Sequence, residues 1–300
     1  MNALLAAERF LDREARLLER HLFAGRPEAV AATLRGFQNP DGGFGHGLEP
    51  DKRCPASLPI DVEVAFQSLA TAGLTASASL TAAATPGPLP GPELLGPAVL
   101  GPACDFLASV TVDGAVPLAF PVIEDHPRAA HWTDWTYTPG VNPTAGLTGL
   151  LYQLDFDHPW RASATRFCWA AIDSGKLPDE AHSLSEVLVF LTHIPDRERA
   201  VSAATSVLDQ LSANELFHPT PKPGAYGLTP LHVAPTADSP WRSYFTAAQI
   251  DAHLDHLAAA QQDDGGWPVT WEPPSQAATL EWRGMVTVQA INILQSYGRV

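Results

Sequence analysis

Residues 38–50 read QNPDGGFGHGLEP, and residues 261–273 read QQDDGGWPVTWEP. The two stretches, called here the first and the second cassette, share the pattern Gln-x-x-Asp-Gly-Gly-aromatic and a later Glu-Pro, in one register without a gap. Each cassette follows apolar residues at helical spacing and precedes another such segment. A unit that repeats within one chain is typical of folds built from stacked helices. The cassettes therefore predict the fold more directly than any other part of the sequence.

The residue types of the cassette suit a clamp between helices. Two glycines permit positive φ and a tight reversal after a helix. The aspartate can accept backbone N–H groups within that reversal, and the glutamine can bond to backbone groups of a neighbouring loop. We expect the aromatic residue to pack against the helix that the chain has just left. This half of each cassette is interpreted as scaffold, and the chemistry is sought in the Glu-Pro half and in the acids beyond it.

The cassettes also carry a family resemblance. HLDHLAAAQQDDGGW (253–267) and TLRGFQNPDGGFG (33–45) resemble the QW repeat of triterpene cyclases and the glycine-rich repeat of protein prenyltransferase β subunits. The resemblance implies their fold, a single all-α domain over residues 1–300 that forms an α/α toroid of concentric helices around a cavity. The chain departs from the catalytic patterns of these families. The string nearest to the Asp-x-Asp-Asp of proton-donating cyclases is DFDH (155–158), and no aspartate-rich magnesium motif or zinc-ligand pattern occurs.

Composition limits the partners. The 300 residues include 45% hydrophobic and 17% charged residues, which argues against disorder. The net charge of −15 disfavours nucleic acid and anionic membrane surfaces. Three widely spaced cysteines predict neither a disulfide framework nor structural zinc. The charged N-terminal segment is not that of a signal peptide, and no apolar run is long enough to span a membrane. We therefore expect a cytoplasmic protein.

Helical periodicity dominates the rest of the chain. An amphipathic first helix is expected over 4–22, and a helix over 61–73 is expected to end at Gly73. Further helices are expected at 28–37, 97–109, 143–155, 159–173, 180–193, 197–213, 246–261 and 277–297, and a small hairpin at 111–116. The Pro/Gly-rich segment 84–102 is predicted to be an excursion of the chain on the surface, without regular helix. The long aromatic segments 113–142 and 214–245 read as ordered functional loops.

The acids after the first cassette are the leading catalytic candidates. LEPDKRCPASLPIDVEVAF (48–66) brings Glu49, Asp51, Asp61 and Glu63 together ahead of a helix. Carboxyl groups held in an apolar cavity have raised pKa values and can donate protons, whereas Lys52 and Arg53 can hold others ionised. The alternative is structural: Glu49 and Asp51 cap a helix or pair with Arg53, and Asp61 is the N-cap of 62–73.

The second cassette offers a matching group. WEPPSQAATLEWRGM (271–285) supplies Trp271, Glu272, Glu281, Trp282 and Arg283. A toroid brings its chain ends together, so we expect Glu49, Asp51, Glu272, Glu281 and Arg283 to face one mouth of the ring. Glu281 is the catalytic candidate, and Trp271, Trp282 and Arg283 are candidates for substrate binding. The structural alternative is an ion pair between Glu281 and Arg283.

Other candidates come from aromatic and histidine residues. HWTDWTY (131–137) contains Trp132, Trp135 and Tyr137, which can stabilise a carbocation, stack on sugar rings or simply form a lid. His46 is retained as an acid–base candidate. His253 and His256 are spaced for a metal site but are expected on a solvated helix face.

Together these features predict a terpenoid-cyclase-like isomerase or lyase that protonates an apolar, isoprenoid-like polyene in a central cavity. No metal or cofactor is expected. One alternative is a carbohydrate-active (α/α)-barrel enzyme with a carboxylate pair and tryptophan platforms. Another is a non-catalytic toroid that binds a hydrophobic ligand or a partner protein.

Overall fold

The computed structural model describes residues 3–82, 99–133 and 135–300, and the side chains of all of these except 74–82. Within these ranges the regular structure is helical and no β-sheet is present, as expected for an all-α chain. The α-helices are α1 (Ala3–Glu14), α2 (Leu17–Phe23), α3 (Pro27–Leu34), α4 (Pro59–Ala82), α6 (Gly101–Ser109), α7 (Val141–Gln153), α8 (Pro159–Asp173), α9 (Ala181–His193), α10 (Arg197–Ala213), α11 (Pro230–Val233), α12 (Ala247–Ala259) and α13 (Gln276–Ser296). Short 3-10 helices are η1 (Arg35–Phe37), η3 (Pro121–Asp125), η4 (Ala130–Trp132) and η5 (Arg242–Tyr244).

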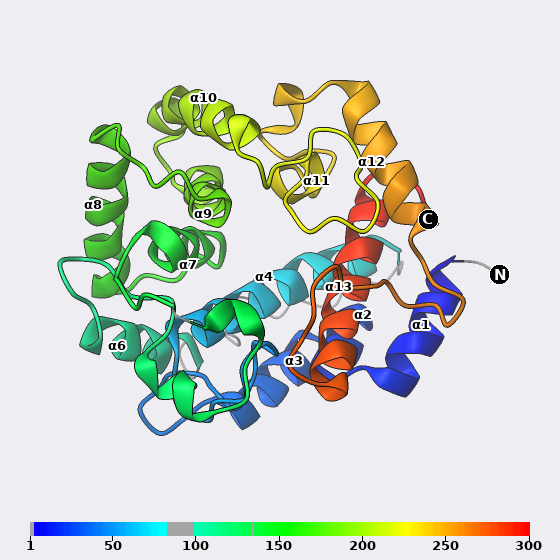
Figure 1. Ribbon diagram of the computed structural model, residues 1–300, viewed down its shortest axis with the longest axis horizontal. Coiled ribbons are helices and arrows are strands. Elements are labelled where there is room, and N and C mark those ends of the chain that lie inside the picture. Colours follow the sequence, from blue (N-terminus) through cyan, green and yellow to red (C-terminus); the bar gives the residue numbers. More distant parts are fainter. Residues whose placement is uncertain (1–2, 83–98, 134) are drawn as a thin grey trace.

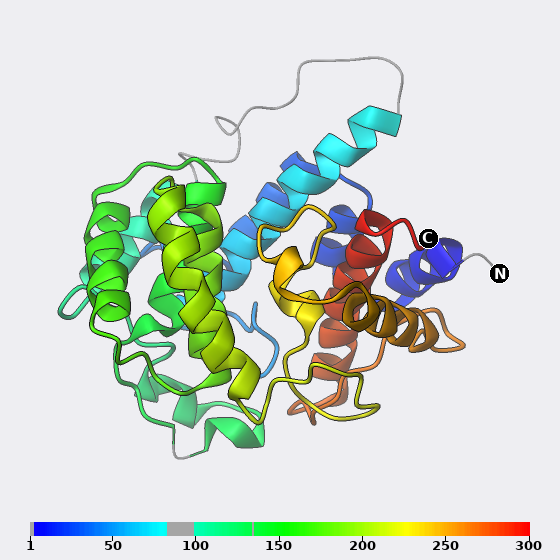
Figure 2. The ribbon, with the colours of Figure 1, turned by 90° about the horizontal axis from the view of Figure 1, so that it is seen from above.

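The helices contact one another in a succession that returns to its start. Helix α2 contacts α4, α4 contacts α7, α7 contacts α9, and α9 contacts α11. The succession continues through α12 to α13, and α13 contacts α2. Figure 1 shows α8, α10, α12 and α1 at the periphery, with α7, α9, α11 and α13 nearer the middle. Figure 2 shows the C-terminal helix α13 between α11 and α1, so the two ends of the chain lie on the same side.

Most helix positions agree with the expectation, and two differ for local reasons. The first predicted helix is two helices, because Arg16 adopts an extended backbone with ψ of 162°. Its guanidinium holds that break by donating to the Leu48 carbonyl at 2.9 Å and to Glu19 at 2.6 Å. Helix α4 does not end at Gly73 but continues to Ala82. A glycine lowers helix stability without ending the helix when its neighbours support it.

The predicted loops are ordered where they are described. The hairpin is a tight reversal between Val112 and Ala115, with positive φ at Asp113 and Gly114. Segment 113–142 contains η3 and η4, and 214–245 contains α11 and η5. Most of the predicted excursion at 84–102 lies outside the described residues. Its last two residues begin α6.

The core is mainly aliphatic and aromatic, and it joins the helices from both ends of the chain. One cluster of buried side chains spans α7, α9, α10, α12 and α13, and another spans α1–α4, α6 and α7. Within the described ranges, no helix is both long and apolar enough to cross a bilayer. Exceptions to the apolar core include a group of buried charges beside the first cassette, where Lys52 is fully buried.

Candidate functional site

The scaffold halves of the two cassettes have the same geometry. In the first, Gln38 donates its side-chain N–H to the Gly42 carbonyl at 2.9 Å and to the Val99 carbonyl at 3.1 Å. In the second, Gln261 donates to the Gly265 carbonyl and to the Ala3 carbonyl, both at 2.9 Å. The cassettes thus clamp the segment that leads into α6 and the first residue of α1, respectively.

The aspartate and glycine of each cassette complete the clamp as their residue types suggest. Asp41 accepts the Gly43 N–H and Asp264 accepts the Gly266 N–H, each at 3.0 Å. The first glycine of each pair has positive φ, 89° at Gly42 and 97° at Gly265. In the second cassette, Trp267 donates its indole N–H to the Leu257 carbonyl of the preceding helix at 2.7 Å.

Beyond the first cassette the chain turns inward and buries four charged side chains within thirteen residues. Lys52 Nζ lies 2.8 Å from Glu49 Oε2 and 3.1 Å from Asp61 Oδ2, and none of the three side chains is more than 6% exposed. Asp61 also accepts the Glu49 backbone N–H at 2.8 Å. Asp61 therefore orders the Glu49–Lys52 turn from inside α4, which begins at Pro59, and is not its N-cap.

The charges of this group balance one another. Burial alone lowers the pKa of Lys52, but the carboxylates of Asp61 and Glu49 outweigh it and raise the pKa. Burial raises the pKa of Asp61 to about 6 despite the opposing effect of Lys52. At neutral pH the lysine is therefore cationic, and the Asp61 carboxyl group is mainly ionised. The expectation that Lys52 holds neighbouring carboxylates ionised agrees with this arrangement, whereas a pair with Arg53 does not form.

Asp51, the fourth buried charge, has a different environment. Its Oδ1 accepts the indole N–H of Trp282 at 2.8 Å and that of Trp271 at 3.3 Å. On the other side, His131 Nε2 lies 3.6 Å from Asp51 Oδ2. Burial, and then the Glu49 carboxylate, raise the pKa of Asp51 to about 6, against the lowering effect of the two indoles. This carboxyl group can therefore hold or release a proton near neutral pH.

Residues from three distant segments meet at Asp51. The second cassette provides Trp271, and α13 provides Trp282. Residues 51–53 pair with 127–129 through short backbone bonds, Ala129 N–H to the Asp51 carbonyl at 2.7 Å and Arg53 N–H to the Pro127 carbonyl at 2.9 Å. This pairing places loop 131–137 against the buried charges. The structure thus brings Trp271, Trp282 and His131, from two of the predicted candidate groups, to Asp51 of the third.

Arg53 and Arg283, which lie beside the site, do not bind the acids that the sequence suggested. Glu281 does not pair with Arg283. It accepts two hydrogen bonds from Arg53, the longer 3.1 Å, so the ion pair links the two cassette regions. Arg283 instead holds Asp264 with two bonds of 2.8 Å, and it therefore belongs to the clamp of the second cassette. Glu272 is exposed.

The remaining candidates differ in their distance from Asp51. Trp132 is buried, and Lys52 Nζ lies 5.9 Å from its ring centroid, so it covers the ion-paired lysine. Trp135 packs against Trp132 with tilted rings whose centroids are 4.9 Å apart, and it is 37% exposed. Tyr137 donates to Glu124 at 2.8 Å, away from the buried charges. His46 is exposed and bonds to Asn39 within the first cassette, which favours a structural role.

Sequence reasoning missed a second polar group that lies near Asp51. Tyr226 packs its ring edge against Trp271 at a centroid distance of 5.9 Å and bonds through its hydroxyl to His182 at 2.7 Å. The only signal was the aromatic content of segment 214–245, because His182 is a single histidine in a helix pattern.

A buried carboxyl pair, Glu63 on α4 and Glu186 on α9, was also missed. Burial and mutual repulsion raise the pKa of Glu63, and burial raises that of Glu186.

The histidine expectation at α12 was wrong in part. His253 is 3% exposed and not on a solvated face, because segment 214–245 covers this part of α12. No group of three or more His, Cys, Asp or Glu side chains in the described ranges is arranged to hold a metal ion.

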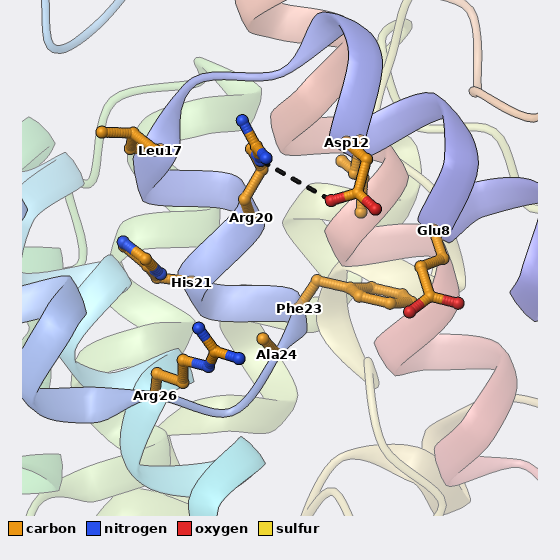
Figure 3. A pocket seen from close by; sticks show the side chains of 9 residues that line it. Glu8, Asp12, Leu17, Arg20, His21, Phe23, Ala24 and Arg26 are labelled. Atoms are coloured by element: carbon orange, nitrogen blue, oxygen red, sulfur yellow. Dashed lines mark ion pairs between the residues drawn. The ribbon is translucent and has the colours of Figure 1, made fainter.

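A surface pocket exists elsewhere in the molecule. Figure 3 shows it between α1 and α2, with the ion pair of Arg20 and Asp12 at its edge. Its volume is about 440 Å³, and its lining residues all lie between Glu8 and Arg26. None of them contacts the buried charges, so this pocket is not part of the candidate site.

Comparison of the chain with protein-family models, with curated proteins and with solved structures gives no match.

Proposed function

We propose that the protein is an α/α-toroid enzyme of the terpenoid-cyclase type, in which Asp51 protonates an apolar polyene. The single observation that carries the proposal is the setting of the Asp51 carboxyl group. It is 5% exposed, it has a pKa raised to about 6, and the indoles of Trp271 and Trp282 hold it. The closed succession of helix contacts from α2 through α13 and back to α2 supports the toroid.

The two carboxylate oxygens of Asp51 suit different parts of proton transfer. Both indole N–H groups point at Oδ1, so Oδ2 is the oxygen from which the proton leaves. After transfer, the indole donors stabilise the carboxylate that has formed, without needing to reorient. Glu49 and Asp61 are less suited as donors, because Lys52 is ion-paired with both of them. The faces of Trp271 and Trp282 can stabilise positive charge that develops on the substrate.

A turnover experiment in deuterated water tests this proposal. Purified protein is incubated with squalene and, separately, with geranylgeraniol, and the products are analysed by gas chromatography and mass spectrometry. We expect a cyclised or isomerised product that carries one deuterium. Asp51→Asn removes the donor and should lower the rate by at least 10²-fold, the usual contribution of a general acid, about 10²–10⁴.

The matched control is Asp155→Asn, an exposed aspartate with positive φ, which asparagine also tolerates. This variant should turn over like the wild type. Undiminished turnover by Asp51→Asn would exclude Asp51 as the proton donor. No product from either polyene would exclude the proposed substrate class.

A carbohydrate-active enzyme is the second candidate, favoured by exposed aromatic rings next to an acidic site. Tyr226 is 44% exposed and Trp135 is 37% exposed, which leaves ring surface for a sugar to contact. Release of aryl leaving groups from a panel of aryl glycosides measures this activity directly. Hydrolysis that is lost in Asp51→Asn would favour this candidate over the polyene.

A further inference from the structure

Three side chains next to the Asp51 site form a continuous hydrogen-bonded series. Glu180 Oε1 lies 2.7 Å from His182 Nδ1, and His182 Nε2 lies 2.7 Å from the Tyr226 hydroxyl. The rings of His182 and Tyr226 are stacked at 6.0 Å. A hydroxyl bonded to an imidazole that is itself held by a carboxylate is the arrangement that activates a nucleophile or base in triad enzymes.

The charges of the three groups couple Glu180 to His182 and keep the Tyr226 phenol protonated. Burial alone raises the pKa of Glu180, but bonds from the His182 side chain and backbone outweigh it and lower the pKa to about 2. The hydrogen bond to Glu180 in turn raises the pKa of His182. Burial and the nearby Glu180 and Asp51 carboxyl groups raise the pKa of Tyr226, so the phenol is protonated at rest. Nδ1–H of His182 donates to Glu180, and in the neutral imidazole Nε2 accepts from the phenol.

The backbone on both sides fixes the positions of these groups. Glu180 is the N-cap of α9 and accepts the N–H groups of His182 and Ser183 at 2.9 and 2.7 Å. On the other side, His218 Nε2 bonds to the Tyr226 carbonyl at 3.0 Å. The next residue is Gly227, where a Cβ would lie 2.4 Å from the Leu216 carbonyl oxygen. Only glycine fits there, so the turn that presents Tyr226 is held tightly.

Tyr226, the last residue of this hydrogen-bonded series, contacts Trp271, one of the two tryptophans that bond to Asp51. The Trp271 ring has Tyr226 against it at 5.9 Å, and its N–H bonds to Asp51. Tyr226 is also 44% exposed, so its phenol can meet a small molecule. The site therefore has an acid and a phenol that share one indole.

We propose that Tyr226 is a second catalytic residue of this site, a phenol activated by His182, with Glu180 as a positioning residue. In the polyene reaction, the phenol oxygen takes a proton from a carbon next to the cation, and the electrons of that C–H bond form the alkene. At the same time the phenol proton moves to His182 Nε2, and the Glu180 carboxylate stabilises the imidazolium. This role in turnover rests on the proposed function, whereas the activation of the phenol does not.

Labelling with an aryl sulfonyl fluoride tests the activation without any substrate. The Tyr226 oxygen forms a bond to sulfur, the S–F bond breaks, fluoride leaves, and the phenol proton moves to His182 Nε2. The chain has five tyrosines. Tyr244 is an internal reference, because it is 36% exposed and donates to Asp209 at 2.7 Å. Peptide mass spectrometry gives the labelling rate of each tyrosine.

We expect Tyr226 to be labelled at least tenfold faster than Tyr244. His182→Gln should lower the Tyr226 rate to that of Tyr244 and leave the Tyr244 rate unchanged, and added imidazole should restore part of the rate in His182→Ala. A merely structural histidine would give no imidazole rescue. Glu180→Gln should lower the labelling rate of Tyr226 less than His182→Gln does, because the glutamine side-chain oxygen can still accept a hydrogen bond from His182 Nδ1–H.

Labelling of Tyr226 no faster than Tyr244, or an unchanged rate in His182→Gln, would overturn the proposal. Asp51→Asn removes a charge that raises the pKa of Tyr226, so labelling should not become slower and should still depend on His182, which separates the two proposals. If the polyene assay fails while His182-dependent labelling persists, the phenol is activated and only the substrate class is wrong. If polyene turnover depends on Asp51 while labelling shows no His182 dependence, Asp51 stands and Tyr226 does not.

Discussion

At the scale of single residues, the carboxyl groups of Glu49 and Asp51 lie in one turn but have different partners. Lys52 binds Glu49 and Asp61 in a fully buried cluster, and it receives further cover from Trp132. Asp51 lies outside this pairing and bonds to neutral indoles, which leave it free to change its protonation state. The Lys52 ion pairs therefore lie next to Asp51, a carboxyl group that takes no part in them. Of these groups, Asp51 is the one suited to proton transfer.

Replacing Asp51 should stabilise the fold above pH 6. Its pKa in the folded state, about 6, exceeds the ordinary value of 3.8, so the stabilising contribution of its proton is present below about pH 4 and lost as the pH rises through 6. Asp51→Asn does not titrate, and it should therefore exceed the wild type by up to about 3 kcal/mol in free energy of unfolding at pH 8, with no such gain at pH 4.

Urea unfolding at pH 4, 5, 6, 7 and 8 measures this difference. The control variant is again Asp155→Asn, whose side chain is exposed. A constant difference between Asp51→Asn and the wild type over this range would contradict the prediction, since it would mean that Asp51 is ionised alike in the folded and unfolded states.

At the scale of elements, close helix approach decides which side chains can meet. The extensive contact of α7 with α9 depends on small residues in VNPTAGLTGLLYQ (141–153). At Gly149 an added Cβ would lie 2.7 Å from the Val189 carbonyl oxygen and 2.8 Å from the Phe190 nitrogen of α9. At Gly146 it would overlap the Glu186 carboxylate, so this glycine leaves the space in which Glu63 and Glu186 lie. The helix order alone does not reveal this.

Gly149→Ala should therefore destabilise the protein by about 1–3 kcal/mol, the usual cost of overpacking. Gly73→Ala is the matched control, because it is also inside a helix but its added Cβ meets no atom within 4 Å. That change should stabilise by about 0.5–1 kcal/mol, since alanine is the better helix former. Thermal and urea unfolding give both values, and equal effects of the two substitutions would disprove the close approach of α7 and α9.

At the scale of the whole molecule, the second cassette links the two ends of the chain. Gln261 holds the Ala3 carbonyl, and a Cβ at Gly265 would lie 2.1 Å from the Ala6 carbonyl oxygen of α1. Helix α1 also contacts α13, which carries Trp282 to Asp51. The clamp therefore determines where the C-terminal part of the site meets the N-terminal part.

Gly265→Ala should loosen this link between the ends. The positive φ of 97° and the contact with Ala6 together should cost about 3 kcal/mol or more, and amide hydrogen exchange in α1 should become faster. Gly175→Ala separates the two causes, because Gly175 has φ of 64° but its added Cβ would meet no atom within 4 Å. It should cost about 1 kcal/mol. Unchanged exchange in α1 of Gly265→Ala would show that the cassette does not hold this helix.

The sequence alone determined the features that depend on local chemistry. Apolar spacing of 3.6 residues predicted most helices, and the cassette residues predicted a reversal that clamps a neighbour, because both depend on residues close in the chain. Pseudo-symmetry of the cassettes predicted that Glu49, Asp51, Glu272, Glu281 and Arg283 face one mouth of the ring. Glu281 pairs with Arg53, next to Asp51 in the chain, whereas Arg283 pairs with Asp264 and Glu272 is exposed. The break at Arg16 and the continuation through Gly73 were not predicted, since contacts with distant segments outweigh local propensity there.

Only the tertiary structure decided the partners at the site. Lys52 and not Arg53 binds the buried acids, Arg53 and not Arg283 binds Glu281, and His182 meets Tyr226 across 44 residues. The cassettes by themselves contain chemically equivalent choices for each of these charges. The packing of the helices decides which ion pairs form, because burial and distance set the strength of each pair. Neither burial nor distance can be read from the order of nearby residues.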